Sequence, residues 1–221
     1  MDAYENIVIG GFIFALGLRL GSLQNSSYDR VAIQLTQQTP LDKTFADLLI
    51  TNSNFLRIVE FKRKSNRGNQ KERTKHALLK MSLNDMKEDL DCFLNLHWYA
   101  ESEFSKHNSQ LSLVPYLEYP SLATRKIKPL TMHEFIEDIV SPTSFVPEEL
   151  ISRYVAILRG LSVNGDGGSD ATGYLIVTRD AEGKIGLATV TKFEDLYVSR
   201  EMLLQNEIKM EPRYNGPSLG R

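Results

Sequence analysis

The chain has little cysteine: Cys92 is the only one among 221 residues. A single cysteine excludes an intramolecular disulfide framework and a zinc site built from several cysteines. This composition fits a reducing compartment, so we expect a cytoplasmic protein. A Gly-x-Ser-x-Gly pattern occurs only at residues 216–220, outside any predicted strand-to-helix turn, so acyl-transfer hydrolysis has little support. Cys92 itself is expected to be a small core residue within a helix.

The sequence also lacks an apolar run long enough to cross a membrane. Residues 7–18 are interrupted by three glycines and fall short of the roughly 18 or more apolar residues of a spanning helix. Residues 1–5 lack the basic start of a secretory signal. We therefore expect a mostly buried helix over residues 2–20 and no membrane partner.

A strong excess of charge is missing as well. The formal net charge of −2 excludes a uniformly basic nucleic-acid-binding coat, although not a local basic segment. The hydrophobic fraction of 42% and the charged fraction of 24% are ordinary for a soluble globular protein. The length favours one domain over 1–211, with its core in 1–120 and additions in 121–211. Residues 212–221 are expected to form a mobile tail.

Apolar periodicity and turn residues predict alternating strands and helices. Thr131 is a good helix cap with Glu134 at the capping-box position, and Pro147 suits the start of another helix. In the first half we expect strands at 31–35, 45–50 and 55–62, a long helix at 71–94, and strand-like segments at 98–99 and 111–119. In the second half we expect helices at 131–140 and 147–161, a glycine-rich loop at 162–170, a hairpin of 173–178 with 185–191, and a helix at 194–204.

The polar cluster at 51–54 predicts a tight antiparallel hairpin between two of these strands. If the hairpin is centred on residues 53 and 54, Asp47 lies directly opposite Glu60, with both side chains on one face. Residues two apart in a strand share a face, so Lys62 projects beside Glu60. Two carboxylates and a lysine would then converge.

Such a cluster has a chemical use. Paired carboxylate oxygens suit Mg²⁺ or Mn²⁺, which also bind a phosphate and a water. The lysine would orient or help deprotonate the attacking water and stabilise negative charge on the scissile phosphate. Without a metal, the two facing carboxylates would repel each other.

The segments FADLLI at 45–50 and RIVEFK at 57–62 resemble the PD-(D/E)XK nuclease superfamily, with Ala46 in place of the motif's proline. The resemblance implies an α/β (α+β) fold with a restriction-endonuclease-like αβββαβ core, a mixed central sheet, and a helix and hairpin as C-terminal additions. It implies that Asp47 and Glu60 bind the metal and that Lys62 assists catalysis. A Mg²⁺- or Mn²⁺-dependent deoxyribonuclease is the expected activity.

The same resemblance implies auxiliary residues. Many members add an acid from the first helix, which would make Glu5 a third metal ligand. Members also place polar residues on the helix after the motif, which makes Gln70 and His76 auxiliary catalytic candidates. His97, His107 and His133 show no metal-ligand spacing, so a core or surface role is expected for them.

A basic segment follows the predicted metal site. Contacts with phosphates would give it affinity without sequence preference and a steep dependence on salt. A solvated helix face is the alternative interpretation. The candidate nucleic-acid-binding residues are Arg63, Lys64, Arg67, Lys71, Arg73 and Lys75.

Several functional alternatives stay open. DNA is the expected partner, RNA is not excluded, and defence against phage, restriction or DNA repair follows from the resemblance alone. An alternative interpretation of the triad of Asp47, Glu60 and Lys62 is a solvated ion-pair face without catalytic function. The chain is then a noncatalytic nuclease-fold subunit that binds a protein partner through its C-terminal half, or a nucleic-acid binder without cleavage. A homo-oligomer is compatible with each alternative.

Overall fold

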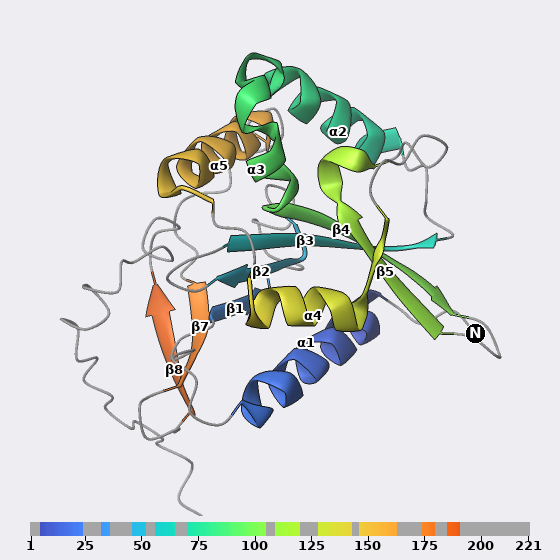
Figure 1. Cartoon of the computed structure of the whole chain (residues 1–221), viewed down its shortest axis with the longest axis vertical. Coiled ribbons are helices and arrows are strands. Elements are labelled where there is room, and N and C mark those ends of the chain that lie inside the picture. Colours follow the sequence, from blue (N-terminus) through green and yellow to red (C-terminus); the bar gives the residue numbers. More distant parts are fainter. Residues whose placement is uncertain are drawn as a thin grey trace, which may run out of the picture.

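The computed structural model shows a mixed α/β protein, with two sheets among the residues that it describes (Figure 1). The larger sheet is mixed and has six strands in the order β1-β2-β3-β4-β5-β6, and the smaller is the hairpin β7-β8. The structure describes residues 5–23, 32–35, 46–51, 56–64, 70–104, 109–119, 128–142, 146–162, 174–179 and 185–190.

The first three strands form an antiparallel meander that contains the predicted hairpin of β2 and β3, and β4 then pairs in parallel with β3. The predicted segment 111–119 is a strand only as far as Pro115, after which the short 3-10 helix η3 (Tyr116–Glu118) begins. The strands of the large sheet are β1 (Ala32–Leu35), β2 (Leu48–Thr51), β3 (Leu56–Arg63), β4 (His97–Phe104), β5 (Ser109–Pro115) and β6 (Leu130–Thr131).

Helices cover both faces of the large sheet. In Figure 1, α2, α3 and α5 lie above the sheet, whereas α1 and α4 lie below it. Two separate apolar clusters occupy these two interfaces. The helices are α1 (Glu5–Ser22), α2 (Gln70–Ser82), the 3-10 helix η2 (Asn84–Asp89), α3 (Leu90–Leu94), α4 (Met132–Val140) and α5 (Glu148–Ser162).

The side chains of β3 alternate between the two interfaces, as a strand buried on both faces requires. Ile58 belongs to the cluster under α2, α3 and α5, while Val59 and Phe61 belong to the cluster with α1 and α4. Glu60 and Lys62 continue the row of Ile58. The strand therefore directs both polar side chains toward the α2 layer.

The N-terminal helix is correctly predicted in position, but the expectation that it is mostly buried is wrong. Val8, Ile9, Phe12 and Leu16 are its buried residues, whereas Ile7, Phe14 and Leu18 are each more than 60% exposed. The helix packs on the sheet along one stripe only. By length and composition alone, the 18 residues of α1 are apolar enough to cross a membrane, which corrects the expectation that this run is too short. Core helices of soluble proteins and signal sequences share these properties.

The single helix predicted over 71–94 is also wrong, because the chain changes direction after α2. Met86 has the non-helical backbone angles φ −115° and ψ 38° within η2. Ser82, Asn84 and Asp85 favour local hydrogen bonds over a continuous helix. The bend buries Leu83 and lets Phe93 of α3 enter the core.

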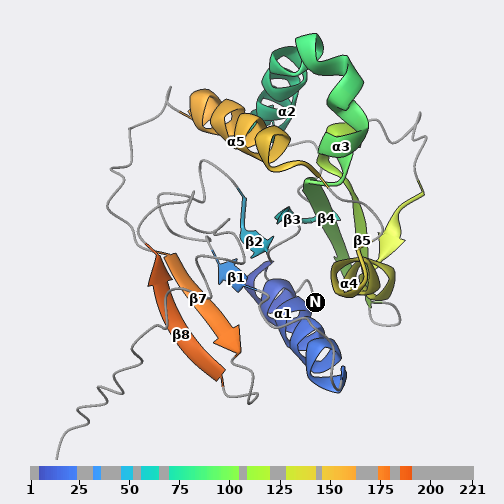
Figure 2. The ribbon, with the colours of Figure 1, turned by 60° about the vertical axis from the view of Figure 1, so that its left-hand side comes forward.

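The predictions for the second half are confirmed where the structure describes it. The Thr131–Glu134 capping box opens α4, and Pro147 immediately precedes α5. Strands β7 (Tyr174–Arg179) and β8 (Ile185–Val190) form the expected hairpin, and β7 lies beside β1 (Figure 2). The predictions for residues 163–170, 194–204 and 212–221 lie outside the described ranges.

Candidate functional site

The hairpin of β2 and β3 has the register that its sequence predicts. Leu48 pairs with Val59, and Thr51 pairs with Leu56. One further step along this register places Asp47, just before β2, opposite Glu60. The open end of the hairpin is therefore where the two predicted acids meet.

Lys62 joins the two carboxylates. Its Nζ lies 2.5 Å from Oε1 of Glu60 and 3.7 Å from Oδ2 of Asp47. It also donates a hydrogen bond to the carbonyl oxygen of Phe61 over 3.0 Å. The side chains of Asp47, Glu60 and Lys62 are only 4%, 7% and 17% exposed. The structure thus brings the three predicted catalytic residues together in a largely buried cluster.

The electrostatics of the cluster keep Lys62 charged. Burial by itself would lower the pKa of Lys62, but attraction to Glu60 and then to Asp47 outweighs burial and raises that pKa above its ordinary value. Lys62 is consequently an ammonium at neutral pH. In this arrangement its side chain supplies positive charge and hydrogen bonds rather than acting as a base.

The second carboxylate oxygen of Glu60 takes no part in the contacts with Lys62. Oε2 of Glu60 is buried and has no hydrogen-bond partner among the residues that the structure describes. Leaving a buried carboxylate oxygen unsatisfied is costly, and such atoms in native proteins call for an explanation. A ligand held by Glu60 would supply one.

Glu72 is a site residue that the sequence reasoning missed. It lies in the first turn of α2, is buried, and accepts a hydrogen bond from the hydroxyl group of Tyr116. Burial raises the pKa of Glu72, and the negative charge of Glu60 raises it further. A second glutamate therefore approaches Glu60 from the helix layer. Its spacing of four residues from His76, which puts both on one helix face, was the available signal.

His76 supports this side of the site. Its Nε2 lies 3.2 Å from the carbonyl oxygen of Leu117, and its ring packs edge-on against Tyr116 and Tyr119. Burial lowers the pKa of His76 to about 4, so the ring is neutral at neutral pH. The predicted auxiliary residue lies behind Tyr116, which in turn holds Glu72.

His97 holds Tyr116 from another side. The two rings stack with centroids 4.0 Å apart, and Nδ1 of His97 lies 3.0 Å from the hydroxyl oxygen of Tyr154. His97 is fully buried, so of the core and surface roles expected for it the structure shows the core role. Cys92 packs against the same core cluster, also as expected.

Comparisons of the chain with models of protein families, with curated protein sequences and with solved structures found no match. Because a fold alone does not fix an activity, the chemistry of the site residues is what indicates a function for this chain.

Glu5 lies close to the cluster. Its Oε1 accepts a hydrogen bond of 3.4 Å from the backbone N–H of Arg63, which ties the start of α1 to the end of β3. The charge of Glu5 also contributes to the raised pKa of Lys62. The predicted third acid therefore comes to the end of β3 that carries Lys62.

The remaining candidates are spread over the start of α2. Gln70 is exposed, and its carbonyl oxygen accepts a hydrogen bond from the hydroxyl group of Thr74. Within the described ranges, Gln70 forms no hydrogen bond with Asp47, Glu60 or Lys62.

The basic residues have different surroundings. Lys64 is exposed and forms an ion pair of 2.5 Å with Glu103 of β4. Lys71 and Arg73 are exposed, whereas Arg63 and Lys75 are half-buried. The charge of Lys75 lowers the pKa of Glu72, so Lys75 interacts electrostatically with a residue of the site. Arg67 lies outside the described ranges.

The donor set can be compared with the needs of a metal ion. Within the described parts of the chain, no group of three or more His, Cys, Asp or Glu side chains is arranged as a metal site. Mg²⁺ usually keeps several waters and binds through one or two carboxylates together with substrate phosphates. Asp47 and Glu60 supply two carboxylates, and Oε2 of Glu60 has no hydrogen-bond partner among the described residues. These residues fit that minimal requirement.

Proposed function

We propose that the chain is a Mg²⁺- or Mn²⁺-dependent phosphodiesterase that cleaves DNA and is built on a restriction-endonuclease-like core. The convergence of Asp47, Glu60 and Lys62 at the open end of one hairpin carries the proposal. The succession of α1, three antiparallel strands, α2 and a parallel β4 supports the core. Defence against phage, restriction or DNA repair are the contexts that we propose for this activity.

Asp47 and Glu60 would hold the metal ion, with Glu5 as the candidate for a third acid. When bound, the ion would polarise the phosphodiester and lower the pKa of a coordinated water. Lys62 would direct its ammonium at the phosphate oxygens on which negative charge develops, where a fixed donor in a largely buried site is most effective. Proton abstraction by Lys62 would require the two carboxylates to be neutralised first, because they raise its pKa.

Glu72 would act on Glu60 rather than on the substrate. Tyr116 fixes one oxygen of Glu72, and burial together with Glu60 raises the pKa of Glu72. A carboxyl group that is easily protonated would limit the repulsion felt by Glu60. It is the positioning residue of the site.

Exposed cations support DNA as the substrate. Lys71 and Arg73 flank Glu72 in the first turn of α2, the turn that faces the triad. A strand whose backbone contacts these two residues would lie beside the cluster of Asp47, Glu60 and Lys62. Such contacts would position the phosphates without reading the bases.

The proposal is tested by incubating plasmid, linear duplex and single-stranded DNA with the full chain and MgCl₂ or MnCl₂. We expect metal-dependent cleavage by the wild type. Glu60→Gln and Lys62→Ala should each reduce the rate by a factor of about 100 or more, because the first removes a charged metal ligand and the second removes the cation at the developing negative charge. The control is Glu149→Gln, which removes a carboxylate from the exposed start of α5 and should leave the rate unchanged. Equal cleavage by wild type and Glu60→Gln would refute the proposed role of Glu60.

One observation favours a second candidate, a noncatalytic nuclease-fold subunit. Lys62 already contacts both carboxylates, so the cluster also has the form of a buried structural ion network. A wild-type protein that is inert on all three DNA substrates and binds no divalent ion would favour this candidate. If the wild type binds Mn²⁺ but cleaves none of the three DNA substrates, the metal site stands and DNA is the wrong substrate.

A further inference from the structure

A pocket of about 530 Å³ lies between the end of α2, η2, α3 and η3, and none of the triad residues lines it. Leu83 and Leu117 contribute its buried apolar wall, and Leu90, which is 37% exposed, contributes a more accessible part. The volume falls in the range of about 300–1,000 Å³ that is usual for small-molecule sites. Its mainly apolar lining would gain from covering an apolar ligand group.

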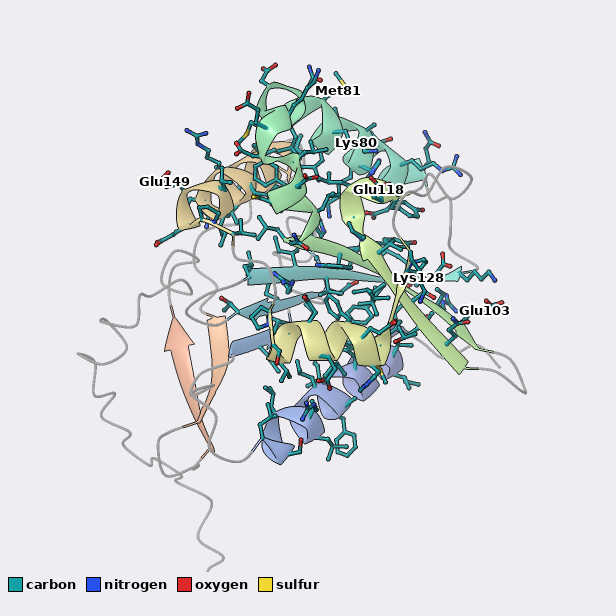
Figure 3. All side chains as sticks on the ribbon, viewed as in Figure 1. Lys80, Met81, Glu103, Glu118, Lys128 and Glu149 are labelled. Carbon is teal, nitrogen blue, oxygen red and sulfur yellow. The ribbon has the colours of Figure 1, made fainter. Side chains whose placement is uncertain are left out.

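Positive charge prevails among the ionisable residues of this pocket. Lys80 and Lys87 both line it and are exposed, and neither forms an ion pair within the described ranges. Among the residues that the structure describes, Glu118 of η3 is the only acidic one that lines it. Figure 3 shows Lys80 on α2 and Glu118 below it on the η3 turn. An anionic group would therefore be favoured here over a cationic one.

We propose that this pocket binds a small amphipathic carboxylate, with its apolar part against Leu83, Leu90 and Leu117 and its carboxylate at Lys80 and Lys87. The apolar part supplies the hydrophobic contribution to binding, while the two ammonium groups supply charge-assisted hydrogen bonds and fix the orientation. The inference is independent of phosphodiester cleavage, since it uses none of the triad residues.

The pocket lies next to the residues that hold Glu72 in the candidate site. The carbonyl oxygen of Leu117 lies 3.2 Å from Nε2 of His76, and the preceding residue, Tyr116, donates a hydrogen bond to Glu72. A ligand packed on Leu117 would therefore lie against the turn that positions Tyr116.

The test is a calorimetric titration of the full chain with octanoate, octyltrimethylammonium or octanol. These probes have similar apolar parts but carry a negative, a positive or no charge. We expect saturable binding of octanoate at one site and weaker binding of the cation. Lys80→Gln/Lys87→Gln should weaken octanoate binding by about fivefold or more, as two exposed charge contacts predict.

The matched control is Lys128→Gln/Arg153→Gln, which removes two positive charges from exposed positions outside the pocket and should leave octanoate affinity unchanged. Leu90→Ala provides a second pocket variant, because its partly exposed position makes misfolding a small risk, and it should weaken octanoate and octanol alike. The proposal is overturned if octanoate does not saturate, if the cation binds as tightly, or if the lysine and control variants behave alike.

Discussion

The backbone N–H of Phe61 donates a hydrogen bond of 2.7 Å to Oδ2 of Asp47. This contact joins β3 to the residue that precedes β2, at the point where the paired part of the hairpin ends. Oδ2 of Asp47 is also the oxygen that lies 3.7 Å from Nζ of Lys62. The same carboxylate therefore fixes the hairpin and contributes to the candidate metal site, and substitutions can separate the two roles.

Asp47→Ala should destabilise the protein more than Asp47→Asn. Alanine leaves the buried N–H of Phe61 without an acceptor, which costs about 1–3 kcal/mol, whereas the asparagine oxygen can still accept it. Both substitutions remove the charge, so their difference isolates the hydrogen bond. Urea unfolding would measure it, and equal stability of the two variants would contradict the structural role of Asp47.

Lys62→Met should lower the free energy of unfolding by about 3 kcal/mol, because it leaves Asp47 and Glu60 buried without their cation. Mn²⁺ should then stabilise this variant more than the wild type, by replacing the lost positive charge. Thermal unfolding with and without MnCl₂ measures both effects.

Lys64→Met is the matched control for Lys62→Met. The Lys64 side chain is 46% exposed in its pair with Glu103, so its loss should cost less than about 1 kcal/mol. Equal stabilisation of the Lys62→Met and Lys64→Met proteins by Mn²⁺ would speak against a metal site at the carboxylates.

Tyr116→Phe should destabilise the protein by about 1–3 kcal/mol, because a buried Glu72 loses its hydrogen-bond donor. In a Glu72→Gln background the cost should fall below about 1 kcal/mol, since the acceptor is no longer charged. A double-mutant cycle at pH 8 measures this coupling. Additive effects of the two substitutions would show that the Tyr116–Glu72 contact does not contribute.

Stability should fall in mild acid through His76. Burial lowers its folded-state pKa to about 4 from an ordinary value of 6.5, so the unfolded chain takes up a proton first as the pH falls. The stability due to neutral His76 is complete above pH 6.5 and is lost toward pH 4, by up to about 3 kcal/mol.

His76→Gln should flatten this part of the stability curve, because glutamine keeps an N–H donor for Leu117 but does not titrate. His133→Gln, at a position with an 82% exposed side chain, should not change the curve. Urea unfolding at several pH values checks both variants, and the same acid slope in His76→Gln and wild type would rule out His76 as the cause.

The β2–β3 hairpin was predictable because its information is local. The polar turn residues indicate the centre of the hairpin, and the alternation of side chains along each strand indicates which residues share a face. The observed pairing of Leu48 with Val59 agrees with both. The capping box of Thr131 and Glu134 was predictable for the same reason. Local signals of this kind need no knowledge of the rest of the chain.

Glu72 was not predictable in this way, because its burial depends on how α2 sits on the sheet. In the sequence it stands within a basic segment, and only the packing of α2 brings it to Tyr116 and Glu60. The buried Arg57, which forms a 3.0 Å ion pair with Asp138 of α4, was hidden for the same reason. The sequence around a charged residue inside a strand or helix does not indicate which distant residue it will contact.

The claim that Asp47 and Glu60 form a metal centre is tested most directly by calorimetric titration of Mn²⁺ into the metal-free full chain. We predict one saturable site in the wild type and an affinity at least about tenfold lower in Glu60→Gln, which has lost a charged ligand. Glu149→Gln should bind as the wild type does. Absence of saturable Mn²⁺ binding, or equal affinity of wild type and Glu60→Gln, would contradict the metal centre.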